Sequence, residues 1–199
     1  PVDLLQMKKE EIRECLKLIE KNLDKCTAIG EIGLDYKYAK TAGQKSAQEE
    51  IFRRQIRITM QNSLPVVVHG RFAEPKTMKI LKEEKAKKVL MHWFTNSEES
   101  VSTAEKLGFY MSCGPIIHSS KESLEIAKKI PEKNLLLETD APVAFLGKQS
   151  EPAWIKEVLE KLAKETKTKK ETLAQKTTQN AAKLFGIKIK NAEPIPDPR

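Results

Sequence analysis

Five short apolar segments recur along the chain, and turn-forming or polar residues bound each of them. The run 64–69 is almost continuously apolar, which is typical of a strand that is buried on both faces of a sheet. These segments predict five β-strands, over residues 27–33, 64–69, 89–94, 108–113 and 134–139.

Amphipathic segments lie between the predicted strands. In residues 8–23, apolar side chains at positions 12, 16, 19 and 23 follow the spacing of one helix face. Similar patterns predict further helices over residues 46–61, 74–86, 97–107, 120–130, 151–165 and 169–185, whereas the polar residues 37–45 indicate a loop. Because strands alternate with helices, we expect parallel βαβ units with right-handed crossovers.

The length of 199 residues allows one sizeable core, and two complete domains are not expected. We expect a single domain over residues 1–187. An irregular tail should follow over residues 188–199, where three of the last six residues are prolines.

Composition narrows the function classes. A hydrophobic content of 39% and a charged content of 32% are typical of a soluble globular protein, and no apolar stretch approaches the roughly 20 residues of a membrane span. The three cysteines lack CxxC spacing, which argues against a disulfide framework or a cysteine-based zinc site and favours a cytoplasmic location. No glycine-rich nucleotide motif occurs, so no organic cofactor is expected. The net charge of +8 favours a polyanionic partner, although most lysines follow helix faces that are typically just solvated.

Four residues with metal-ligating chemistry stand at the carboxyl ends of different predicted strands. They are Glu31, His69, His92 and Asp140. A barrel of alternating strands and helices assembles its catalytic site at this end of the strands. Imidazole and carboxylate ligands suit Zn²⁺, Mn²⁺, Co²⁺ or Ni²⁺. We therefore predict a metal-dependent hydrolase, although a single histidine or acid at a strand end would more often be structural.

Other polar residues accompany these four. Asp35 follows Glu31 in GEIGLDY, and Glu138 lies two residues before Asp140, so that Glu138 and Asp140 share one face of the strand. One of that pair is expected to ligate metal while the other lies nearer the middle of the barrel. Arg71 is expected to contact either a phosphate or a neighbouring carboxylate, and His118 to lie in a loop.

Residues 26–187 resemble the TatD family of metal-dependent deoxyribonucleases. The segments that carry the resemblance occur in the family's order: AIGEIGLDY, LPVVVHGR, HWFTNS, LLLETDAP and EP…TTQNAAKLFG. The resemblance implies a (β/α)₈ TIM barrel of the metal-dependent hydrolase type. It also implies two divalent metal ions (Zn, Mg, Mn, Co or Ni) and DNA, as single strands or strand ends, as the substrate.

The resemblance also assigns roles to individual residues. Glu31 would be shared between the two metals, His69 and His92 would bind the second metal, and Asp140 would bind metal and handle the nucleophilic water. Arg71 would lie near the phosphate. Glu31 and Asp140 are thus the expected catalytic residues.

The chain departs from the family's pattern in three places. Gly70 stands where Ser is common, and Trp93 and Asn96 alter a string that is often HCFTG. The family's first strand carries a D-x-H-x-H motif that supplies two histidine ligands, and this motif is absent from the 199 residues. We therefore expect about five of the eight barrel strands in this chain, with the N-terminal three missing.

Two alternatives to a deoxyribonuclease stay open. The same barrel could hydrolyse another ester or amide, as an aminoacyl-RNA deacylase or a small-molecule amidohydrolase. This alternative gains from the lack of one loop that is rich in both basic and aromatic residues. The chain could instead be an inactive nucleic-acid-binding protein, if it is naturally truncated.

Overall fold

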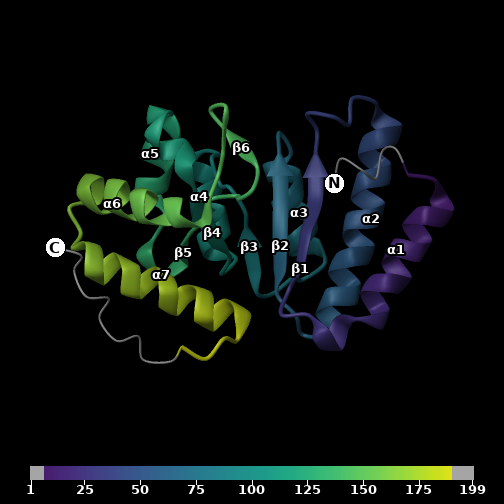
Figure 1. The fold of residues 1–199 in the computed structure, drawn as a ribbon. Helices are drawn as coiled ribbons and strands as arrows, with labels where there is room; N and C mark the ends of the chain where they lie inside the picture. Colours follow the sequence, from purple (N-terminus) through teal and green to yellow (C-terminus); the bar gives the residue numbers. More distant parts are fainter. Residues whose placement is uncertain (1–6, 190–199) are drawn as a thin grey trace.

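The computed structural model describes residues 7–189. Five parallel strands form one sheet in the order β1-β2-β3-β4-β5, so that neighbours in the chain are neighbours in the sheet (Figure 1). The strands are β1 (Ile29–Asp35), β2 (Val66–Arg71), β3 (Val89–Met91), β4 (Tyr110–Cys113) and β5 (Leu135–Leu137). This sequential order is typical of a barrel wall and differs from a doubly wound sheet, in which the order reverses. All five predicted strands are confirmed; β3 and β5 end earlier than predicted, and β1 and β2 end later.

Within the described residues, seven α-helices accompany the sheet, one for each predicted helical segment. They are α1 (Lys9–Lys21), α2 (Ala42–Gln61), α3 (Glu74–Glu83), α4 (Glu98–Lys106), α5 (Lys121–Lys129), α6 (Ile155–Thr166) and α7 (Lys170–Phe185). Short 3₁₀ helices occur as η2 (Leu23–Lys25), η3 (Pro115–His118), η4 (Glu132–Asn134) and η5 (Pro152–Trp154). Within residues 7–189, no helix has both the length and the apolar character needed to cross a membrane.

Two further local predictions are wrong, and one element was not predicted. Helix α2 begins four residues before the predicted residue 46, because Thr41 and Gln44 form a reciprocal capping box at its N-terminus. His118 lies in η3 rather than in a loop. Residues 144–149 form an unpredicted hairpin of β6 (Ala144–Phe145) and β7 (Lys148–Gln149). Residues 190–199, most of the expected irregular tail, lie outside the described residues.

The two faces of the sheet have different neighbours because strand side chains alternate. Val66, Val68, Met91 and Met111 belong to the large core that the surrounding helices cover. Residues of the opposite face, which would be the inside of a barrel, form a smaller cluster of Leu90, Leu136 and Leu184 with Val67, Tyr110, Ala181 and Phe185 at its margin.

Helix α7 lies at the amino-terminal end of β5. The Asn180 side chain donates hydrogen bonds to the carbonyl oxygens of Glu132 (2.6 Å) and Leu135 (2.8 Å), and Leu184 packs among the inner-face leucines. Apolar packing therefore fills this end of the inner face. Polar side chains are free to gather at the other end, where the strands terminate.

Candidate metal centre

Polar side chains replace apolar ones on the inner face as the strands approach their carboxyl ends. In β2, Val67 belongs to the apolar inner cluster and His69, two residues later, faces the cleft; Leu90 and His92 repeat this pattern. The two-residue period of a strand thus places an imidazole directly beyond each apolar residue.

Glycine brings β1 and β2 close together beside His69. Gly33 has φ +134°, and a Cβ atom built there would lie 2.1 Å from the carbonyl oxygen of His69. Only glycine fits such a close approach with this backbone conformation. The second glycine of GEIGLDY therefore sets the distance between the acids of β1 and the first histidine.

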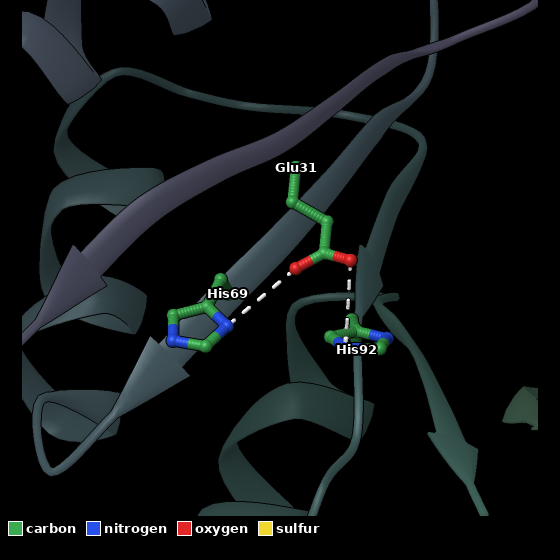
Figure 2. Close-up of side chains that lie close together, drawn as sticks. All are labelled: Glu31, His69 and His92. Carbon is green, nitrogen blue, oxygen red and sulfur yellow. Dashed lines mark ion pairs between the residues drawn. The ribbon is translucent and has the colours of Figure 1, made fainter. Parts of the chain in front are cut away.

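Glu31 directs its two carboxylate oxygens at different histidines (Figure 2). Oε2 lies 3.5 Å from Nδ1 of His69, and Oε1 lies 3.6 Å from Nε2 of His92. One ligand atom from each of the three residues lies within 4.8 Å of the others.

These separations suit metal ligation better than hydrogen bonding. Good N–H···O hydrogen bonds span about 2.7–3.2 Å. Ligands at about 2.1 Å from one tetrahedral ion lie roughly 3.4 Å apart. The donor set and its spacing in Glu31, His69 and His92 therefore fit a divalent metal.

Asp140 approaches the same centre from the end of β5. Its Oδ1 atom lies 3.6 Å from Nε2 of His92, and its φ of 56° turns the chain sharply after the strand. All four predicted ligands thus come together, although Asp140 is not part of the compact Glu31–His69–His92 group. Their role as metal ligands stays a prediction. Arg71, at the end of β2, lines the same cleft.

Asp35 holds His69 from the side opposite to Glu31. Asp35 is 1% exposed, and its Oδ2 lies 3.1 Å from Nε2 of His69. Its other oxygen accepts a hydrogen bond from the Lys37 amide (2.9 Å), and its own amide donates to Gln48 (3.0 Å). The carboxylate is therefore fixed, and it orients the ring so that Nδ1 faces Glu31.

Glu138 plays the corresponding part for His92. Its Oε2 forms a short ion pair with Nδ1 of His92, and its Oε1 accepts hydrogen bonds from the Trp93 amide (2.6 Å) and the Ser112 hydroxyl. With Nδ1 engaged, the Nε2 atom faces the carboxylates of Glu31 and Asp140. Of the two acids in ETD, Glu138 is thus the one that lies deeper and orients a histidine.

The cluster of acids governs the protonation of the site. The interaction with the His69 imidazole is the main cause of the lowered pKa of Glu31. Burial alone would lower the pKa of His92, but the hydrogen bond and charge of Glu138, helped by Glu31 and Asp140, raise it to about 9. Burial raises the pKa of Asp140. The carboxylates thus favour positive charge between them, which a divalent cation supplies more strongly than a proton.

An open cleft of about 590 Å³ gives access to these groups. Glu31, Asp35, His69, His92 and Asp140 all line it. Ligand pockets typically span about 300–1,000 Å³, so the cleft has the size of a site for one small ligand or one segment of a polymer. Parallel strands, a carboxyl-end cleft and this donor set together define a metal-dependent hydrolase.

Comparisons with known proteins agree with this class. The family model described as TatD related DNase matches residues 1–186. The chain belongs to this family. It is 39% identical to the metal-dependent hydrolase YabD of Bacillus subtilis, over 94% of this chain and 75% of that protein. It is 34% identical to human deoxyribonuclease TATDN3, over 93% of this chain and 69% of that protein.

A solved structure confirms the fold. The crystal structure of YjjV, a TatD homologue of Escherichia coli, superposes with a TM-score of 0.82 at 25% identity, covering 93% of this chain and 73% of that chain. The predicted fold class, a partial TIM barrel of the metal-dependent hydrolase type, is therefore confirmed.

We expect Asp35→Asn and Glu138→Gln to weaken metal binding by about 10- to 100-fold each. In Asp35→Asn, the side-chain oxygen keeps the hydrogen bond from the Lys37 amide, so the NH₂ group points toward Nε2 of His69. The ring proton then moves to Nδ1 and blocks that ligand atom. A glutamine at position 138 has only one acceptor oxygen. The two carboxylate oxygens of Glu138 now bind the His92 ring, the Trp93 amide and the Ser112 hydroxyl.

Calorimetric titration with Mn²⁺ or Zn²⁺ measures both effects, and the exposed acids Asp24 and Glu157 provide the matched controls Asp24→Asn and Glu157→Gln. Unchanged affinity in Asp35→Asn and Glu138→Gln would show that these acids do not orient the histidines.

Proposed function

We propose that this chain hydrolyses phosphodiester bonds of DNA and that it does so with two divalent cations. The observation that carries the proposal is the position of Glu31, whose two oxygens face His69 and His92 separately at 3.5 and 3.6 Å. Oδ1 of Asp140 also lies 3.6 Å from Nε2 of His92, so Glu31 stands between the histidines and Asp140 and suits a shared ligand. The family's description as DNases and the name of the human relative support DNA as the substrate.

The residues divide naturally between two cation positions. Glu31, His69 and His92 would hold one cation, and Glu31 with Asp140 would contribute to the other. Zn, Mg, Mn, Co and Ni are the candidates that imidazole and carboxylate ligands admit. Bound there, such ions lower the pKa of water and offset the charge that develops on a reacting phosphate.

The chain's own groups position the substrate and move the proton. Asp140 is partly buried and its pKa is raised by that burial, so it accepts a proton more readily than an ordinary aspartate. We assign it the proton of the attacking water. Arg71 lines the cleft and, as a guanidinium, can bind two phosphate oxygens at once. We assign it the non-reacting phosphate oxygens.

A substrate panel tests the proposal. We expect the purified protein to release nucleotides from an end-labelled single-stranded oligonucleotide in the presence of Mg²⁺, Mn²⁺ or Zn²⁺, and to lose this activity with a chelator, because the carboxylates and imidazoles alone cannot neutralise the phosphate. The panel includes an aminoacyl ester and simple amides. If the protein hydrolyses these compounds but leaves DNA uncleaved with every metal, the assignment of DNA is wrong and another ester or amide is the substrate.

A further inference from the structure

Exposed apolar side chains gather at the rim of the metal-centre cleft. Leu146 and Phe72 are 73% and 72% exposed, the highest values among the large apolar side chains of residues 7–189. Phe72 lines the cleft together with Tyr38 and Val143, which are also exposed. Leu146 forms the tip of the β6–β7 hairpin, directly after Val143, Ala144 and Phe145.

The backbone holds both of the most exposed residues in an unfavourable conformation. Phe72 has φ 54° and Leu146 has φ 50°, values that bulky side chains rarely adopt. Leu146 and Gly147 form the two-residue turn of the hairpin, where Asn-Gly is the common pair. An apolar side chain presented to solvent from a strained position is a sign of a binding role.

Packing fixes the hairpin beside the metal centre. The Phe145 ring meets the Trp93 ring edge-on, with 6.1 Å between the centroids, and Trp93 directly follows His92. Gly114 makes room for this tryptophan, because a Cβ atom there would lie 2.6 Å from the indole ring. Trp93, which departs from the family's common string, thus places the hairpin at the cleft.

Cationic side chains lie among these apolar groups. Arg71 precedes Phe72, and both line the cleft. The Nζ atom of Lys37 lies 5.7 Å from the centroid of the Tyr38 ring, and Lys148 is exposed in β7 of the hairpin. Cationic groups that follow a phosphate backbone, interleaved with flat apolar groups that contact bases, are typical of sites for single-stranded nucleic acid.

We propose that Phe72 with Tyr38, and the hairpin tip at Leu146, contact the unpaired nucleobases that flank the scissile phosphate. The inference rests on the proposed function and adds which side chains of this chain contact the bases of a single strand. In a duplex the base faces are covered by stacking, whereas single strands present them to aromatic platforms. Strands β3 and β4 separate β2, which precedes Phe72, from β5, which precedes the hairpin, so the two platforms contact different nucleotides.

Base-bearing and abasic oligonucleotides test the inference. Phe72→Ala and Leu146→Ala are compared with Leu18→Ala, a change of an exposed leucine on α1 (62% exposed). The measurement is the ratio of kcat/KM for a single-stranded oligonucleotide to kcat/KM for the same strand with abasic sites beside the cleaved bond. We expect Phe72→Ala to lower this ratio roughly 5- to 150-fold, the range for loss of one base–aromatic stack, and Leu146→Ala to lower it less.

Bis(4-nitrophenyl) phosphate separates this inference from the proposed function. If the wild type hydrolyses DNA and the small diester but both variants keep the wild-type ratio within twofold, the stacking role is wrong and the proposed function stands. If the wild type hydrolyses neither substrate with any metal, the proposed function fails. Fluorescence anisotropy of a labelled single strand in chelator then decides the stacking role, because Phe72→Ala should weaken binding and Leu18→Ala should not.

Discussion

Replacing Glu31 with glutamine is expected to lower the proposed kcat/KM for DNA by about 10³-fold or more, a loss of several kcal/mol of transition-state stabilisation. The amide keeps the size of the side chain but has no negative charge and only one ligating oxygen. Because Glu31 faces both histidines and would also contribute to the cation position beside Asp140, the change affects both proposed cation positions together. Steady-state kinetics over a range of metal concentrations measure the loss.

Glu157→Gln is the matched control, since Glu157 is an exposed glutamate on α6. Thermal unfolding of both variants checks the fold, which should persist in Glu31→Gln because the partly exposed Glu31 belongs to neither core cluster. Wild-type activity in Glu31→Gln at low metal concentration would contradict the shared-ligand role.

Local patterns were sufficient to predict the order of the elements. Apolar residues run without a break over 64–69 and recur at helical spacing over 8–23, because these segments bury side chains between the sheet and the helices. Both elements, β2 and α1, are present. The gathering of the candidate ligands at one edge of the sheet could be predicted for the same reason. In parallel strands a polar residue just beyond an apolar run must reach the carboxyl-end edge, as His69 and His92 do.

Features that depend on turns were harder to predict. Strand β3 ends at Met91 rather than at residue 94, because Trp93 adopts φ 47° and turns the chain. The hairpin of residues 144–149 has a leucine where a turn residue is usual, so its sequence lacks the Asn-Gly signal. Such positions follow tertiary contacts, here the packing of Phe145 on Trp93, instead of local preference.

Which of the two acids Glu138 and Asp140 orients a histidine could be decided only from the structure. Glu138 and Asp140 alternate along one strand end, and alternation alone permits either to ligate. The Trp93 amide and the Ser112 hydroxyl, which come from two other segments, decide that Glu138 lies inside. In the same way, the basic and aromatic rim is assembled from separate segments, each too short to be recognised as a binding loop.

The change Asp140→Asn tests the proton-transfer role directly. Asparagine retains an oxygen that can ligate a cation but cannot accept the proton of the attacking water. We therefore expect kcat to fall by about 10²- to 10⁴-fold, while metal affinity falls much less. The exposed Asp24→Asn serves as the control.

Comparing leaving groups shows which proton Asp140 handles. If Asp140 accepts the proton of water, its loss slows hydrolysis of DNA and of bis(4-nitrophenyl) phosphate to a similar extent. If it instead protonates the leaving oxygen, the nitrophenyl diester is largely spared, since nitrophenolate leaves without a proton. Equal losses on both substrates are the expected result. Asp140 and Glu31 both lie beside His92, so the Asp140 carboxylate is next to the proposed cation positions. A spared nitrophenyl diester would reverse the assignment and make Asp140 the general acid.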